Sequence, residues 1–137
     1  MGDLNASLAA SSSGLRAQTN RMRIAAENVA NASSTAETPG GDPYRRRVPV
    51  FEETLLRESG AKGVRVIGAR DDPSDFRVEL NPGHPAADAQ GYVKLPNVDA
   101  LVEVFDMREA SRAYEANLNM IEAARNMGAR ALELLRR

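Results

Sequence analysis

Hydrophobic residues near the start of the chain recur every seven positions. Leu8, Leu15, Met22 and Val29 form one such series, and a seven-residue spacing returns to the same face of a helix after two turns. We therefore predict a helix over residues 4–32 with these four side chains along one seam. The seam beside it is small or polar, because it consists of Leu4, Ser11, Gln18, Ala25 and Ala32.

The middle of the chain alternates between turns and extended segments. Residues 38–43 contain two prolines and two glycines, which excludes a helix there. Residues 44–51 are predicted to be extended, and Pro49 restricts that segment to a sheet edge. Side chains alternate over residues 64–67 and 76–80, and the turn sequence DDPSD lies between them. We predict that these last two segments form a small β-hairpin.

A loop and a second long helix complete the pattern. Residues 81–97 contain three prolines and two glycines, so we predict an ordered loop without regular structure. After Pro96, either Asn97 or Asp99 can cap a helix that meets no further proline before the end of the sequence. At about 1.5 Å per residue, this helix is expected to be about 60 Å long.

The final helix has two neighbouring apolar faces, which together form a stripe wider than one partner helix can cover. We therefore expect other molecules to cover part of it. Asn117 is polar and lies within a seam, where it disfavours wrong registers and stoichiometries. The first face consists of Tyr114, Leu118, Ile121, Gly128, Leu132 and Leu135, interrupted by Arg125, and the second of Ala113, Asn117, Met120, Ala124, Met127, Ala131 and Leu134.

The composition excludes several kinds of chemistry. The 137 residues are 42% hydrophobic but include only three Phe, three Tyr and no Trp, so the core must be mainly aliphatic. The net charge of -1 argues against a protein whose main task is to neutralise nucleic-acid phosphates. The absence of cysteine excludes disulfides, thiol catalysis and thiolate metal sites.

The polar residues that stand out favour structural roles. His84 is the only histidine and is interpreted as an ordinary loop residue. Residues 45–47 are all arginine, and an exposed or intersubunit ion-paired edge is favoured over nucleic-acid binding. Asn28 and Asn31 fit either a helix end or hydrogen bonds between subunits. We expect no enzyme activity, no cofactor and no metal ion.

Four stretches of the sequence resemble the flagellar basal-body rod proteins: AENVANASS, TPGGDPYRRRVPVF, GHPAADAQGYVKLPNVD and SRAYEANLNMIEAARNM. The first stretch resembles axial proteins of the flagellum in general, and GYVKLPNVD resembles the proximal rod subunit more specifically. The residues that carry these two signatures are Asn28, Asn31, Gly91, Tyr92, Pro96 and Asn97.

The resemblance implies an α+β fold that is mainly α. Residues 1–33 and 97–137 are expected to pair as an antiparallel coiled coil, and residues 34–96 to form an extended and β-structured middle region with an ordered loop at 81–97. The implied function is that of a structural subunit of the proximal rod. Such subunits polymerise through their terminal helices into a hollow structure that crosses the periplasm, transmits torque and conducts exported proteins.

The resemblance also implies partners and a route of export. The expected partners are other copies, other flagellar rod proteins and the flagellar type III export apparatus, without nucleic-acid binding or direct membrane insertion. Residues 1–15 lack the basic and apolar regions of a cleaved signal peptide, which taken alone predicts a cytoplasmic protein. The resemblance implies export without such a peptide instead. The alternative is a soluble coiled-coil adaptor that binds an unrelated helix through its apolar stripe.

Overall fold

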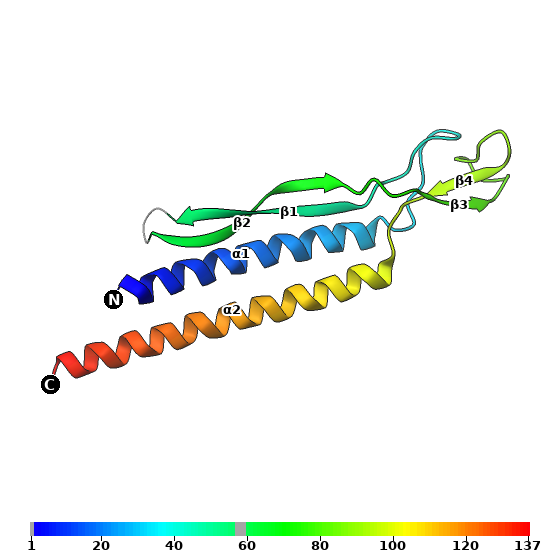
Figure 1. The fold of residues 1–137 in the computed structure, drawn as a ribbon. Helices are drawn as coiled ribbons and strands as arrows, with labels where there is room; N and C mark the ends of the chain where they lie inside the picture. Colours follow the sequence, from blue (N-terminus) through cyan, green and yellow to red (C-terminus); the bar gives the residue numbers. More distant parts are fainter. Residues whose placement is uncertain (1, 57–59) are drawn as a thin grey trace.

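Two long antiparallel helices organise the protein. The computed structural model describes residues 2–56 and 60–137; Met1 and residues 57–59, which belong to the predicted terminal and middle regions, lie outside the described residues. Helix α1 spans Gly2–Ala30 and helix α2 spans Ala100–Leu135. They run in opposite directions along each other (Figure 1). Together they make up about half of the chain, which confirms the predicted α+β class.

A long β-hairpin covers the other side of α1. Strands β1 (Arg47–Leu56) and β2 (Ala61–Asp71) pair antiparallel, and both contact α1. Helix α1 therefore lies between the hairpin and α2 (Figure 1). Strands β3 (Arg77–Leu80) and β4 (Tyr92–Leu95) form a second antiparallel pair, near the end of α1 and the start of α2. Within the described ranges, neither helix is long and apolar enough to cross a membrane.

The strand pairing differs from the predicted hairpin. Residues 64–66 pair with residues 51–53, and residues 77–80 pair with 92–95. The two predicted segments are therefore not partners, and the prediction of irregular structure is wrong for residues 92–95. The physical reason is that β1 and β2 form ten cross-strand pairs along α1, whereas DDPSD connects one sheet to the other. Pro49 is accommodated because both strands of a two-stranded sheet are edges.

The β1–β2 hairpin contains a bulge that shifts its register. Val50 pairs with Gly68 and Phe51 pairs with Val66, so Ile67 has no partner residue across the ladder. Gly68 has a φ of 155°, a conformation that side chains with a Cβ rarely adopt. The bulge reverses which side chains of β2 face α1 on its two sides, and bulges also increase the local twist of a strand pair.

Small residues in the middle of α1 allow two layers to pack against it. Ser13 Oγ donates to the carbonyl oxygen of Ala10 (2.8 Å) and accepts from the backbone N–H of Val64 in β2 (3.2 Å). Gly14 leaves no room for a side chain, because a Cβ atom at this position would lie 2.7 Å from Nδ2 of Asn117 in α2. On Gly63 in β2, an added Cβ would lie 2.7 Å from Ser13 Oγ. The run of poor helix formers at residues 11–14 thus marks a place where hairpin and α2 both approach the helix closely.

The helix boundaries follow local signals. Asp99 is the N-cap of α2, and its side chain accepts from the backbone N–H of Leu101 at 2.9 Å. The alternative cap, Asn97, makes other contacts. Helix α1 ends at Ala30, two residues before the predicted end. Beyond the helix, the guanidinium of Arg77 donates to the carbonyl oxygen of Ala32 at 3.3 Å. This contact gives a hydrogen-bond donor to one of the carbonyl groups that follow the helix end.

Packing between Gly14 and Asn117 gives a testable prediction. Replacing a helical glycine by alanine normally stabilises a helix by about 1 kcal/mol, but here the added methyl group meets Asn117. We expect Gly14→Ala to be at least about 1 kcal/mol more favourable in the Asn117→Ala background than in the wild type. Urea unfolding of the four proteins of this double-mutant cycle measures the difference. An equal effect in both backgrounds would show that the contact does not limit the approach of the helices.

Candidate functional site

Helix α2 exposes most of its large apolar side chains. It fully buries only Glu103, Ala110, Ile121 and Ala124. Apolar side chains along the rest of the helix lie at the surface because, among the described helices and strands, α1 alone packs against it. The most exposed in its second half are Met120 (56%), Met127 (63%), Leu132 (56%), Leu134 (70%) and Leu135 (82%).

Leu135 lies five turns beyond Asn117 and points in the same direction, whereas the other four side chains lie on two flanks of the seam between α1 and α2. Successive residues of an α-helix are about 100° apart. Residues two positions apart, such as Leu118 and Met120, therefore point in directions about 160° apart. Asn117 and Ile121 lie between these directions and face α1. We call the side with Leu118 and Leu132 the leucine flank, and the side with Met120, Met127 and Leu134 the methionine flank.

The methionine flank borders a groove between the two helices. It has a volume of about 510 Å³ and is lined mainly by apolar and small side chains. The small residues on α2 would let another helix approach closely. From α1 it is lined by Asp3, Leu4 and Ser7, and from α2 by Met120, Ala123, Ala124, Met127 and Ala131.

The residues predicted to form the seam of α1 are only half-buried. Leu8, Leu15, Met22 and Val29 all fall in this intermediate class. Tyr114 and Asn117 on α2 are half-buried as well, and Asn117 Nδ2 donates to the carbonyl oxygen of Ala113 at 3.0 Å. The fully buried positions of α1 are Ser11, Ser13, Gly14, Ala17, Ile24, Ala25 and Asn28.

At the opposite end of the helix pair, Asn28 connects α1 to the chain that enters β1. Its side chain is 1% exposed. Its Oδ1 accepts from the Tyr44 hydroxyl (2.7 Å) and from the backbone N–H of Arg47 (3.0 Å), and its Nδ2 donates to the Arg47 carbonyl oxygen (2.9 Å). Burial raises the pKa of the Tyr44 hydroxyl, which keeps it protonated as a donor. Asn28 thus makes hydrogen bonds within its own chain.

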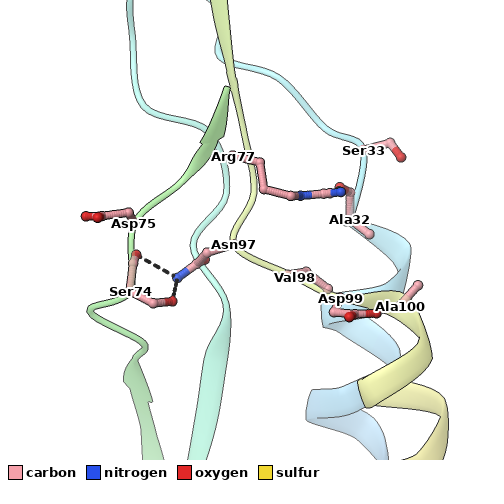
Figure 2. A pocket seen from close by; sticks show the side chains of 9 residues that line it. All are labelled: Ala32, Ser33, Ser74, Asp75, Arg77, Asn97, Val98, Asp99 and Ala100. Atoms are coloured by element: carbon pink, nitrogen blue, oxygen red, sulfur yellow. Dashed lines mark hydrogen bonds between the residues drawn. The ribbon is translucent and has the colours of Figure 1, made fainter. Parts of the chain in front are cut away.

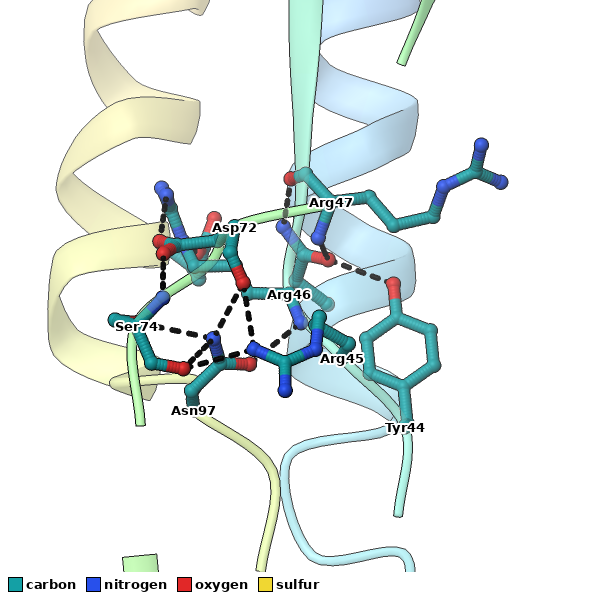
Figure 3. A network of polar contacts seen from close by, with 9 residues as sticks. Tyr44, Arg45, Arg46, Arg47, Asp72, Ser74 and Asn97 are labelled. Atoms are coloured by element: carbon teal, nitrogen blue, oxygen red, sulfur yellow. Dashed lines mark hydrogen bonds and ion pairs between the residues drawn. The ribbon is translucent and has the colours of Figure 1, made fainter. Parts of the chain in front are cut away.

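Arg46 links three segments through ion pairs. Its Nε pairs with Glu103 of α2, whose side chain is 1% exposed, and its NH1 lies 3.3 Å from Oδ2 of Asp72. Asp72 also accepts from the backbone N–H of Ser74 at 2.8 Å. Ser74, followed by Arg46, lowers the pKa of the Asp72 carboxyl group below its ordinary value. The expectation that the arginine run forms an exposed or intersubunit edge is wrong for Arg46, because its partners are intrachain (Figure 3).

Asn97 and Arg45 complete this polar junction. Asn97 Oδ1 accepts from the backbone N–H of Arg46 (2.7 Å), and its Nδ2 donates to the carbonyl oxygens of Asp72 and Ser74 (both 3.1 Å). Arg45 donates to the same two carbonyl oxygens (both 2.8 Å), and its guanidinium lies 4.1 Å from the ring centroid of Phe76. We use "polar junction" for these contacts of Asn28, Tyr44, Arg45, Arg46, Arg47, Asp72, Ser74, Asn97 and Glu103.

A polar pocket of about 590 Å³ opens beside the junction, between the end of α1 and the start of α2. Figure 2 shows Asn97 hydrogen-bonded to Ser74 at this pocket. Its charged side chains belong to Asp75, Arg77 and Asp99. Two of these already have roles, because Asp99 caps α2 and Arg77 donates to the carbonyl oxygens of Ala32 and Pro96. The pocket is therefore largely committed to holding the helix ends in place.

The other signature residues stabilise the turn regions. Asn31 Nδ2 donates to the Glu27 carbonyl oxygen at 2.8 Å, a contact at the end of α1. Gly91 has a φ of 89°, and a Cβ there would lie 2.9 Å from Pro82. Tyr92 is largely exposed in β4, and Pro96 is fully buried after it. His84 Nδ1 accepts from the backbone N–H of Ala86 at 3.0 Å, which places it in a loop turn.

Sequence reasoning did not identify Glu103, Asp72 or the specific role of Arg46. Glu103 lies in the first turn of α2, where an acidic residue has an ordinary explanation in the helix dipole. One signal in the sequence could have revealed its burial: Glu103 lies seven residues before Ala110, on the same face of the helix, and Ala110 is buried. Within residues 2–56 and 60–137, no group of three or more His, Asp or Glu side chains could hold a metal ion.

Comparison with known proteins identifies the family. Residues 89–134 match the family described as flagellar basal body rod FlgEFG protein C-terminal. The flagellar basal-body rod protein FlgC of Agrobacterium fabrum is 47% identical over 136 residues, which cover 99% of this chain and 98% of that protein. The FlgC proteins of Yersinia enterocolitica and Bacillus subtilis are 39% and 36% identical, over 89% and 93% of this chain and 90% and 95% of theirs.

This chain belongs to the FlgC family of flagellar basal-body rod proteins. Membership supports a structural role in the rod, in assembly with other rod components. The matched residues 89–134 contain β4 and nearly all of α2. The segment that the FlgC chain shares with the wider rod family is therefore the one that carries the exposed apolar flanks.

The hydrogen bonds of Asn28 in this FlgC family member predict a large loss of stability on truncation. Asn28→Ala leaves the Arg47 N–H and C=O and the Tyr44 hydroxyl without their buried partner, so we expect a loss of about 2–3 kcal/mol in the free energy of unfolding. Tyr44→Phe is the matched control, because it removes one of the three bonds and should cost only about 1 kcal/mol. Chemical denaturation measures both. Equal losses in the two variants would contradict a central role for Asn28.

The lowered pKa of Asp72 predicts a specific pH dependence. The unfolded carboxyl group has a pKa of about 3.9, and the folded one lies lower, so its contribution to stability is present above pH 4 and is lost as the pH falls through the folded value. Asp72→Asn should therefore be less stable than the wild type at pH 7, with the difference shrinking below pH 4. Unfolding curves recorded between pH 7 and pH 2 test this. A difference that stays constant with pH would contradict it.

Proposed function

We propose that this protein polymerises through its terminal helices into the hollow proximal rod of the flagellum, where it transmits torque and surrounds the export channel. In this proposal residues 1–33 and 97–137 form the inner, helical domain, and residues 34–96 lie outside it and fix contacts with neighbours. The rod crosses the periplasm, and the protein reaches it through the flagellar export apparatus without a cleaved signal peptide.

The exposed apolar surface of α2 is the observation that supports polymerisation. Complete burial of a Leu or Met side chain stabilises by about 1.5–3 kcal/mol. Met120, Met127 and Leu134 on one flank and Leu132 on the other are all more than half exposed. Contiguous exposed apolar surface of this kind is characteristic of interaction sites. Neighbouring subunits that covered both flanks would supply the burial that α1 alone does not.

The polar junction supports the transmission of torque. A subunit that carries a mechanical load needs its middle region fixed to its helices. Arg46, Asn97 and Asn28 fix the start of β1 to both helices and to the connection after β2. Because these contacts join segments far apart in sequence, relative rotation of hairpin and helices would break several hydrogen bonds together.

Two features support export of an unfolded chain. The sequence contains no cysteine, so no disulfide has to be broken before passage. Helix α1 contains Ser11, Ser12, Ser13 and Gly14, which have low helix propensity. Its order therefore depends on tertiary and intersubunit packing that forms after export. The membership in the FlgC family favours this function over a soluble adaptor.

We expect Met120→Glu combined with Met127→Glu to prevent incorporation into the rod and to abolish swimming. Both side chains are more than half exposed, so the isolated chain should keep its fold and its helical circular dichroism signal. Loss of two buried methionines at an interface, with two charges in their place, should weaken association at least about 100-fold. Swimming in soft agar and the protein content of purified basal bodies are the measurements.

Asn119→Glu with Asn126→Glu is the matched control. Both residues are exposed on α2 and point about 80–120° away from Met120 and Met127. This variant should assemble and swim like the wild type. Normal swimming by the methionine variant would overturn the proposed interface, and an equal defect in the control would show that added charge alone blocks assembly.

A further inference from the structure

We propose that neighbouring copies pack side by side, with the leucine flank of one α2 seated in the groove beside the methionine flank of the next. This inference rests on the proposed polymerisation and specifies the contact that forms it. The occupant of the groove is a second copy of this chain, and the contact is heterologous, because two different surfaces meet.

The two surfaces have complementary shapes. The groove contains Ala123, Ala124 and Ala131, so a neighbouring helix can approach at the short end of the usual 8–10 Å range. The leucine flank offers Leu118 and Leu132, fourteen residues and therefore four turns apart on one line of the helix. Met120 and Met127 border the groove and have flexible side chains that can adapt to such insertions.

Charge supplies the argument for a second copy as the occupant. Arg125 lies midway between Leu118 and Leu132 on the same helical line, where it interrupts an otherwise apolar face. Asp3 lines the groove in the first turn of α1. Both side chains are exposed, and among the described residues neither takes part in an ion pair. The leucine flank thus carries an unpaired cation and the groove an unpaired anion. Because one chain has both, the leucine flank of one copy is complementary in charge to the groove of another.

The placement of the two surfaces determines the kind of assembly. They lie on opposite flanks of the α1–α2 seam, so a copy that offers its leucine flank to one neighbour leaves its groove open for another. Heterologous contacts of this kind generate closed rings or helical arrays rather than isolated pairs. In such an array the long axes of the α2 helices run side by side, as a hollow tube requires.

The test exchanges the two charges between separate chains. In an assembly of Arg125→Glu chains, the new glutamate meets Asp3 of the neighbour, which has the same charge. In an assembly of Asp3→Arg chains, the new arginine meets Arg125 of the neighbour, which also has the same charge. Each purified variant should therefore associate at least about tenfold more weakly than the wild type in sedimentation velocity. An equimolar mixture of the two variants should recover association to near the wild-type level, because every contact between unlike chains in it joins opposite charges.

Arg108→Glu is the matched control, since it makes the same charge change at an exposed position of the same helix that points at least about 80° away from the side chains of both flanks, and it should associate like the wild type. The proposal is overturned if the wild-type chain stays monomeric, if neither single variant weakens association, or if the mixture associates no better than its components. Failure here combined with a swimming defect in the Met120 and Met127 variant would leave polymerisation standing and assign the groove to a different rod protein.

Discussion

The fold depends on the double packing of helix α1, which has a β-hairpin on one side and a second helix on the other. Two layers can approach a helix this closely only if its side chains are small where both meet it, and Ser13 and Gly14 fulfil that condition. The helix therefore gains its stability from neighbours and not from its own propensity. Because α1 is enclosed, α2 has one partner among the described helices and strands and exposes the remainder of its apolar circumference.

The two ends of the molecule do different work. At one end, the polar junction joins the helices to both strand pairs through amide and guanidinium groups with fixed geometry. At the other end, apolar side chains of α2 lie at the surface. Hydrogen bonds with strict directions suit a joint that must not rotate. Non-directional apolar contact suits a surface that has to accept neighbours in a growing assembly.

The helices were predictable because a seven-residue repeat is a local signal that survives in any fold. The N-cap of α2 was predictable for the same reason, because the Asp99 side chain accepts from the backbone N–H of Leu101, only two residues away. The strand partners were not predictable in this way, since the segments around 64–66 and 77–80 each carry an alternating pattern that does not specify its partner. The same limit applies to Arg46 and Glu103, which are 57 residues apart in sequence. A run of three arginines suggests exposure, and only the tertiary structure shows that the middle one faces a buried carboxylate.

The bulge at Ile67 has a consequence for how this chain can vary. Side chains of a strand alternate between its two faces. One extra residue therefore moves every side chain in the remainder of the strand to the face opposite the one that its position in the sequence would otherwise give it. Removal of Ile67 would make Val66 and Gly68 neighbours opposite Phe51 and Val50, so the pairing would become regular and both faces would be kept. Removal of a paired residue such as Val64 would exchange the two faces beyond it. Length changes in this hairpin should thus be tolerated in pairs, at its tip or at the bulge, and single deletions of paired residues along its shaft should be selected against.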